Sequence, residues 1–403
     1  MKIVHVCMGF PVEYPGGITN YVRSLASSQT DKHEVTVVCN GGPDNKPEGQ
    51  GYKVIRYNSP IRNFSLSLNK EDPNIDSFVA MLVNENADLY HFHSLLGIDT
   101  NFLKKWKNKN YIVSLHDYNT ICPRVFMVKG DGEICRTVKL DACTTCVGYL
   151  NQIDILNRVS NKFSIPLPRI KSNNVINRND LFVDFLNRSL MCYPVSKRVG
   201  EIFINAGVDI NKCKVITIGN DSASTFSSRV PSTGSKVQIA FLGTFTRIKG
   251  AELFIKMMKE IGTDKFDFNL YGRGDNKLIE IFKNLGGIYH GSYSPNALPS
   301  ILSNIDIGAV LSIWEDNGPQ VVMEMINNGI PVLGTSRGGI PDFIRHQETG
   351  FIFDPDTELK SAISWLSNMN KEYLTEMMEN ICPLKSPKAH CLEFEQEIIS
   401  LCE

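Results

Sequence analysis

The residues most able to do chemistry are two acids beside glycine and proline. Asp316 and Glu324 stand eight positions apart in the segment 312–341, and Gly318-Pro319 lies between them. Proline suits the first position of a helix, because its missing N–H would have no partner there. We therefore predict a helix over 319–329, with Asp316 on the preceding loop and Glu324 about one and a half turns inside. Carboxylates at these places can accept hydrogen bonds from two separate sets of hydroxyl groups.

The start of this predicted helix favours an anion. The backbone N–H groups of Gln320 and Val321 lack partners within the helix, and a helix N-terminus carries about half a positive charge. Phosphate groups bind at such ends. A ligand with phosphate in the middle and hydroxyls at both ends fits the acids and the helix end together. A sugar nucleotide has that shape.

A second motif places two cations after a glycine, in the segment 241–250. Gly243 ends a predicted strand and lets a ligand approach the backbone closely. Arg247 and Lys249 are spaced to hold a diphosphate, with about 1.5–3 kcal/mol for each charge-assisted bond. A solvated basic loop before a helix is the other interpretation. The acids of the first motif favour the phosphate clamp.

Two glycine motifs and a histidine mark further strand ends. Gly16-Gly17 precedes a helical pattern and Gly272 follows a predicted strand, so both allow a backbone approach to a ligand. Neither motif has the dinucleotide-binding spacing, which argues against a nicotinamide enzyme. His116 ends a predicted strand and can donate to a phosphate or sugar oxygen. A tight turn at Gly272 and a structural role for His116 are the alternatives.

Four cysteines raise the question of a metal. Their spacing is C-x12-C-x7-C-x2-C, at Cys122, Cys135, Cys143 and Cys146. Four thiolates of this kind can hold a structural zinc ion in tetrahedral geometry. Two pairs of reduced thiols are the alternative. The catalytic motifs themselves contain no acidic pair typical of a divalent-cation site, so we predict that no metal or other cofactor is required for the reaction.

Alternating strands and helices position these motifs. The predicted strands of the first half are 2–8, 34–39, 53–57, 88–93 and 111–117; those of the second half are 214–218, 237–243, 266–272, 288–291, 307–312 and 331–334. The clearest helix, 251–261, has one apolar face. Such alternation predicts parallel, doubly wound sheets, whose ligands bind at the carboxyl ends of the strands. We predict α/β domains at 1–194 and 195–370, followed by terminal helices over 371–403.

Composition excludes several classes of protein. The chain has 403 residues, 42% of them hydrophobic and 21% charged, with a net charge of −1. These values predict a globular protein that does not bind nucleic acid. The sequence shows no signal peptide and no apolar run long enough to span a membrane. Eleven cysteines in that setting predict reduced thiols in a cytoplasmic protein.

Two basic regions suggest contact with an anionic membrane. Segment 156–198 has eight Lys or Arg against two Asp, a local charge of +6. Another cluster comprises Lys104, Lys105, Lys107 and Lys109 with Trp106. Polybasic segments gain about 1 kcal/mol per charge near anionic lipid. The inner face of the membrane is therefore a second location to test, with a solvated surface as the alternative.

The motifs together resemble the retaining glycosyltransferases of family 4, which have the GT-B fold of two Rossmann-like domains facing a cleft. The resemblance covers nearly the whole chain; its landmarks are Gly16-Gly17, His116-Asp117, Val195-Ser196, Gly243 with Arg247 and Lys249, Asp316-x7-Glu324, and Gly338-Gly339. One departure is the first acid of the pair, Asp316, where the family has Glu. The His-Asp-Tyr and later cysteines resemble a subset from surface-polysaccharide pathways.

The resemblance implies a role for each residue. Asp316 faces the donor sugar, Glu324 holds the ribose hydroxyls, and Arg247 with Lys249 holds the diphosphate. His116 lies near the transferring sugar, and Gly16, Gly17, Gly243, Gly272 and residues Gly318, Pro319, Gln320 and Val321 bind the donor.

These roles imply a glycosyltransferase that moves a sugar from a nucleoside-diphosphate sugar to a glycan or polyprenyl-linked acceptor with retention of configuration. A sugar-nucleotide 2-epimerase is the first alternative, since it shares the fold but not the clamp. A noncatalytic nucleotide-sugar-binding protein is the second.

Overall fold

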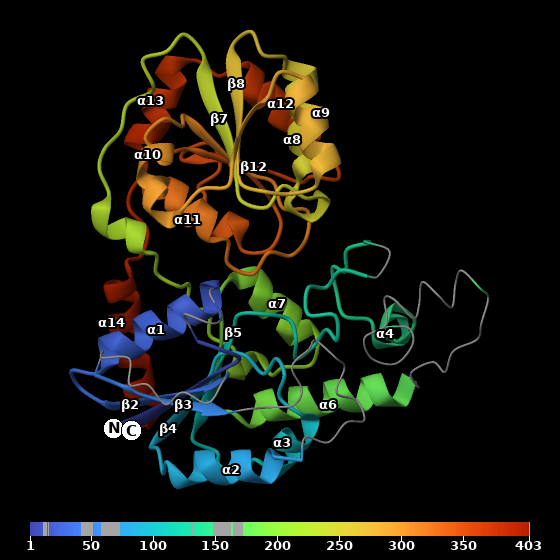
Figure 1. Ribbon diagram of the computed structural model, residues 1–403, viewed down its shortest axis with the longest axis vertical. Helices are drawn as coiled ribbons and strands as arrows, with labels where there is room; N and C mark the ends of the chain where they lie inside the picture. The colour runs from blue at the N-terminus through green and yellow to red at the C-terminus, as the bar shows by residue number, and fades with distance from the viewer. Residues whose placement is uncertain are drawn as a thin grey trace. The chain divides into compact units, whose positions relative to one another are not determined.

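The computed structural model describes residues 1–10, 14, 16–41, 51–57, 73–129, 132–147, 163 and 172–402. These residues form two compact units (Figure 1). Unit 1 comprises Met1–Ile216 with Cys391–Glu403, and unit 2 comprises Thr217–His390. Each unit contains a six-stranded parallel sheet. The predicted pair of doubly wound α/β domains is therefore confirmed.

The sheet of unit 1 has the strand order β3-β2-β1-β4-β5-β6. Its strands are β1 (Lys2–Cys7), β2 (Glu34–Asn40), β3 (Lys53–Tyr57), β4 (Leu89–Phe92), β5 (Tyr111–Leu115) and β6 (Met191–Pro194). Almost every residue of the four central strands is buried. Burial of both faces explains why these segments are continuous apolar runs rather than alternating ones.

Helices cover both faces of this sheet. On one face Leu25 of α1 (Gly17–Gln29) and Phe394 of α14 (Pro387–Cys402) pack against Ile3. On the other, the Phe92 ring contacts Phe102 and Phe185. These two rings come from α3 (Thr100–Lys105) and α6 (Ser172–Arg188), beside α2 (Ile75–Asn84). Two further helices of unit 1 are α4 (Leu140–Val147) and α7 (Lys197–Asn205).

The sheet of unit 2 has the order β12-β11-β10-β7-β8-β9. Its strands are β7 (Val237–Leu242), β8 (Phe266–Tyr271), β9 (Ile288–Gly291), β10 (Ile307–Val310), β11 (Val332–Thr335) and β12 (Gly350–Phe353). One face packs on α8 (Ala251–Ile261), α9 (Asn276–Asn284), α12 (Leu359–Ser367) and α13 (Lys371–Glu379). The opposite face bears α11 (Gln320–Ile326), near α10 (Leu298–Leu302) (Figure 1).

Three predictions about the chain's organisation differ from the structure. The segment predicted as a strand at 214–218 has no strand, although it bonds to β6 through Lys214 N–H and Ile216 N–H. Strands β6 and β12 were not predicted. Because Lys214 N–H and Ile216 N–H donate to β6, unit 1 continues to Ile216 rather than ending at 194.

The terminal helices predicted over 371–403 do not form a separate part. Leu374 and Met377 of α13 lie in the core of unit 2, whereas α14 from Cys391 onward belongs to unit 1. No helix in the described part of the chain has the length and apolar character needed to cross a membrane.

Candidate functional site

A pocket of about 330 Å³ opens in unit 2, where β7 and β10 end. Seven of the predicted site residues line it: Gly243, Lys249, Asp316, Gly318, Pro319, Gln320 and Val321. They come from both motifs, which are far apart in sequence. Parallel strands bring them together because their carboxyl ends share one edge of the sheet. Thr244 and Ser312 also line the pocket and were not singled out from the sequence.

The strand end at Gly243 leaves backbone exposed to the pocket. Gly243 has φ +114, and a Cβ added there would meet open space among the described residues. Gly272, with φ +138, lies behind it, because a Cβ there would collide with the Gly243 carbonyl oxygen. Gly272 does not line the pocket. It permits the close approach of two strand ends, and the bare Gly243 backbone faces the ligand space.

Lys249 and Asp316 contact each other directly. The Lys249 Nζ lies 2.6 Å from Asp316 Oδ2, and Ser312 Oγ donates to the same oxygen at 3.0 Å. The Lys249 ammonium also lies 5.2 Å from the centre of the Trp314 ring. Asp316 is 8% exposed, so its carboxylate depends on these donors for compensation. The clamp motif and the acid motif therefore form one polar site.

The neighbouring acid, Glu315, anchors the loop instead of lining the pocket. Its Oε2 accepts a hydrogen bond from Gly338 N–H at 3.0 Å, and Gly339 N–H donates to the Asp316 carbonyl at 2.7 Å. Glu315 is 2% exposed and is not among the pocket residues. The structure thus places Asp316, rather than Glu315, at the pocket.

Gly338 is required by this loop contact. Its φ is +55, and a Cβ there would collide with the Asp316 backbone. We expect Gly338→Ala to lower the free energy of unfolding by about 3 kcal/mol or more, from backbone strain plus the collision. Gly291→Ala is the matched control, because Gly291 has φ +78 but open space among the described residues. Equal losses in urea unfolding would contradict the loop contact.

Glu324 lies inside α11, which begins at Gln320 and ends at Ile326, a shorter helix than predicted. Glu324 is half-buried, and this burial raises the pKa of its carboxyl group. Its charge also contributes to the raised pKa of Tyr293. Glu324 does not line the pocket around Lys249. Gln320, one turn earlier, accepts a hydrogen bond from Asn220 at 2.7 Å.

Arg247 and Lys249 differ in position. Both belong to the short 3-10 helix η3 (Arg247–Lys249), which follows β7. Arg247 is 55% exposed and lies 3.9 Å from Glu252, so it faces solvent and does not line the pocket. Of the two predicted clamp cations, Lys249 alone lines this pocket.

The predicted residues of unit 1 gather at the start of α1 and the end of β5. Gly16 and Gly17 begin α1, where added side chains would meet little in the described structure. His116 follows β5, with its ring 4.8 Å from that of Tyr21. Asp117 accepts hydrogen bonds from Ser94 Oγ at 2.7 Å and Asn119 N–H at 2.9 Å. These contacts hold the His-Asp turn in place.

The cysteine motif lines one cavity of about 240 Å³ in unit 1. Burial raises the pKa of Cys143 to about 11. The four sulfur atoms of this motif do not all lie within 4.8 Å of one another; they belong to Cys122, Cys135, Cys143 and Cys146. Among the described residues, three histidines do have ring nitrogens this close together. The four cysteines are therefore not arranged here as a metal site.

Trp106 does not belong to the lysine cluster on the surface. Its side chain is 0% exposed and packs edge-on against Tyr90 and Phe92. Lys105 forms an ion pair with Asp76. Within 104–109, the side chain of Trp106 is buried in the core, whereas the four lysine side chains are exposed at the surface. Of the other basic segment, 156–198, residues 156–162 and 164–171 lie outside the described residues.

Family models match both units of the chain. The model for "Glycosyl transferases group 1" matches residues 224–381, and that for "Glycosyltransferase Family 4" matches residues 15–131. The first match includes the pocket, and the second includes Gly16, Gly17 and His116. The chain belongs to this family of glycosyltransferases.

Curated relatives match less than half of the chain. An uncharacterized 41.2 kDa protein in the cps region of Klebsiella pneumoniae is 25% identical, over 37% of this chain and 43% of that protein. The sulfoquinovosyl transferase SQD2 of Arabidopsis thaliana is 26% identical over 43% and 36%, respectively. Protein CapJ of Staphylococcus aureus is 26% identical over 41% and 44%. The chain thus matches under half the length of each relative.

Solved structures share the fold over the whole chain. A glycosyltransferase from Rickettsia africae has a TM-score of 0.65 with 15% identity, covering 100% of this chain and 98% of that one. Anabaena HepE, solved with UDP-glucose, has a TM-score of 0.60 with 15% identity, covering 99% and 98%. These similarities confirm the GT-B fold.

Proposed function

We propose that this protein is a retaining glycosyltransferase. It transfers a sugar from a nucleoside-diphosphate sugar to a hydroxyl group of a glycan or lipid-linked acceptor, in the assembly of a surface polysaccharide. The pocket that unites Gly243, Lys249 and Asp316 carries this proposal, because it offers a diphosphate site next to a carboxylate. The relatives from capsule regions and the UDP-glucose complex of HepE support the substrate class.

Different residues of the site bind different parts of the donor. The bare backbone at Gly243 and the Lys249 ammonium receive the diphosphate, and Arg247 approaches it from the rim. Asp316, held by Lys249 and Ser312, accepts from hydroxyls of the sugar. Glu324 accepts from the ribose hydroxyls. Ionised Glu324 lacks full hydration in its half-buried position, so a diol gains more there than in water.

Negative charge develops on the leaving diphosphate during the reaction, and the site must stabilise it. The bond between the anomeric carbon and the diphosphate oxygen breaks, and the acceptor oxygen bonds to that carbon on the same face. The acceptor proton passes to the departing diphosphate. Lys249 stabilises the negative charge that develops there, which is where a fixed cation contributes most. This role takes the place of a divalent cation, so no cofactor is required.

In this proposal unit 1 binds the acceptor, and its glycine loop and His116 also contact the donor. Gly16 and Gly17 leave space at the start of α1, and His116 lies at the end of β5. His116 donates to an oxygen of the transferring sugar. The ring of Tyr21 and the fixed Asp117 turn hold its backbone in place.

A thermal-shift screen tests the donor. The protein is heated with UDP-, GDP-, ADP- or CMP-sugars, and one nucleotide class is expected to raise the melting temperature. A ligand at 100 times its dissociation constant adds about 2.7 kcal/mol. Incubation of that sugar nucleotide with and without acceptor then separates transfer from epimerisation. Conversion without acceptor would support the sugar-nucleotide 2-epimerase, and no shift with any class would contradict the proposal.

We also propose peripheral contact with anionic membranes through the lysines of 104–109. All four lysines are exposed, which supports electrostatic attraction to lipid headgroups. We expect the protein to float with liposomes containing anionic lipid and not with neutral ones. Replacing the four lysines by glutamine should abolish flotation, whereas Lys256→Gln with Lys259→Gln on α8 should not. Equal flotation of both variants would assign binding to another surface.

A further inference from the structure

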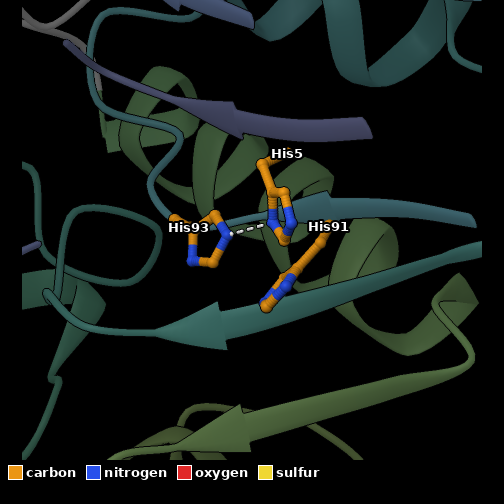
Figure 2. Close-up of side chains that lie close together, drawn as sticks. All are labelled: His5, His91 and His93. Carbon is orange, nitrogen blue, oxygen red and sulfur yellow. Dashed lines mark hydrogen bonds between the residues drawn. The ribbon is translucent and has the colours of Figure 1, made fainter. Parts of the chain in front are cut away.

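Three histidines meet in the core of unit 1, apart from the pocket in unit 2. His5 lies on β1, His91 on β4, and His93 directly after β4. Each is 0% exposed, and one nitrogen from each ring lies within 4.8 Å of the other two (Figure 2). Polar side chains are rarely buried in this way without a partner that compensates for lost water.

Strand periodicity puts the three rings on one face of the sheet. His5 and His91 are direct neighbours in the β1–β4 register. Alternate residues of a strand share a face, so His5 lies on the side of Ile3, and His91 and His93 on the side of Leu89. Ile3 and Leu89 pack with residues of α1 and α14. The cluster is therefore enclosed between the sheet and these helices.

The outer nitrogens of two rings are already held. Nε2 of His5 lies 2.8 Å from Gln29 Oε1, an acceptor, so this nitrogen carries the proton and Nδ1 is left with its lone pair. Nε2 of His91 lies 2.7 Å from Ser114 Oγ. His5 shows the arrangement of metal-binding histidines, in which the far nitrogen is fixed by a hydrogen bond that sets the tautomer. The Ser114 hydroxyl can accept the Nε2 proton of His91 in the same way, which leaves the lone pair on Nδ1.

His93 completes the set. Its Nε2 lies 2.9 Å from His5 Nδ1, as the dashed line in Figure 2 shows. Its Nδ1 is buried and has no hydrogen-bond partner among the described residues. A metal ion can replace this hydrogen bond by binding both nitrogens, if the His93 proton moves from Nε2 to Nδ1. The number of bound protons does not change in that step.

We propose that His5, His91 and His93 form a binding site for one divalent transition-metal ion, most suitably Zn²⁺ or Co²⁺. Three neutral imidazoles suit these ions and not Mg²⁺ or Ca²⁺, which prefer oxygen ligands. The ion would bind β1 to β4 beneath α1 and so act structurally. His93 follows directly after the strand, and its ring lies 5.8 Å from that of half-buried His116, which gives the side of entry.

Cobalt loading of the untagged protein tests this site. All four cysteines of the cavity are first replaced by serine, so that thiolates there cannot bind the probe. After exposure to Co²⁺ and dialysis, we expect one ion per chain, with visible absorption and without a thiolate charge-transfer band. The variant His93→Gln should retain at least about tenfold less, and Gln29→Met should bind about 10–100-fold more weakly. His346→Gln, an exposed histidine of unit 2, should load normally.

Two results would overturn the proposal. One is the absence of retained cobalt in the chain with all its histidines, and the other is equal loading of folded His93→Gln. If His93→Gln does not fold, X-ray absorption of cobalt in the chain with native histidines and cysteines decides. A first shell of nitrogen atoms supports the histidine site, whereas sulfur atoms would place the ion at the cysteines.

Discussion

Replacing Lys249 by alanine is expected to lower kcat for sugar transfer by about 100-fold or more, the usual cost of removing one fixed group that stabilises the developing charge. The physical reason is the loss of the cation at the diphosphate, where negative charge grows as the glycosidic bond breaks. Initial rates at saturating donor and acceptor measure this effect. Lys256→Ala, an exposed lysine on α8, is the matched control and should retain wild-type turnover.

Lys249 also forms an ion pair with Asp316, so its replacement affects stability as well as turnover. Without Lys249, the nearly buried carboxylate of Asp316 keeps, among the described residues, only the hydrogen bond from Ser312, so the single variant should also lose some stability. Adding Asp316→Asn removes the uncompensated charge and should restore the free energy of unfolding without restoring transfer. Wild-type turnover by either Lys249 variant would remove this residue from the proposed mechanism.

The second large effect is expected at Glu324. Replacing it by glutamine should raise the KM for the donor about 10–100-fold, because charge-assisted bonds to the ribose hydroxyls are lost. Effects on kcat should be smaller, since these bonds exist in the ground state as well as in the transition state. Glu260→Gln, an exposed glutamate on α8, serves as the control. Unchanged donor KM in Glu324→Gln would contradict the ribose assignment.

The raised pKa of Glu324 adds a test on stability. A carboxyl group whose pKa is higher in the folded than in the unfolded state lowers stability as the pH rises above its unfolded pKa, and the loss is complete above its folded pKa. Glutamine carries no such charge, so Glu324→Gln should melt at a higher temperature than the wild type at neutral pH. The difference should vanish below about pH 4, where both states of the wild type are protonated. A lower melting temperature at neutral pH would contradict the burial argument.

If Glu324→Gln raises the melting temperature and weakens donor binding, Glu324 serves function rather than stability. A half-buried carboxylate without a fixed cation is costly to the fold, and a bound diol reduces that cost. Sites of this type often conflict with stability. The experiment therefore separates a ligand-binding role from a packing role, since loss of a packing residue would lower both quantities.

Much of the fold could be predicted because buried parallel strands form continuous apolar segments with polar residues at their ends. The strand at Lys53–Tyr57 and the helix at Ala251–Ile261 have the predicted bounds. Strand β6 was not predicted, because the burial of its Tyr193 depends on Phe394 from the distant C-terminal helix. A sequence window cannot contain such a partner.

The functional site, like the fold, was predictable only in part. Local spacing placed Lys249 and Asp316 in two motifs, and strand ends predicted that both lie at one edge of a sheet. The direct bond between them was not predictable, because its 2.6 Å distance depends on how β10 and β7 are paired. The anchoring of Glu315 by Gly338 likewise joins separate loops.

The motif around Asp316 and Glu324 shows what could be predicted from the sequence and what only the tertiary structure decided. By itself the sequence predicted the class of ligand, because acids, glycines and cations at strand ends need no distant partner to suggest a sugar nucleotide. Only the tertiary structure decided which acid reaches the pocket, that Arg247 faces solvent, and that three histidines share one core. These outcomes depend on contacts between segments far apart in the chain, whose free energies appear only when the sheets are assembled.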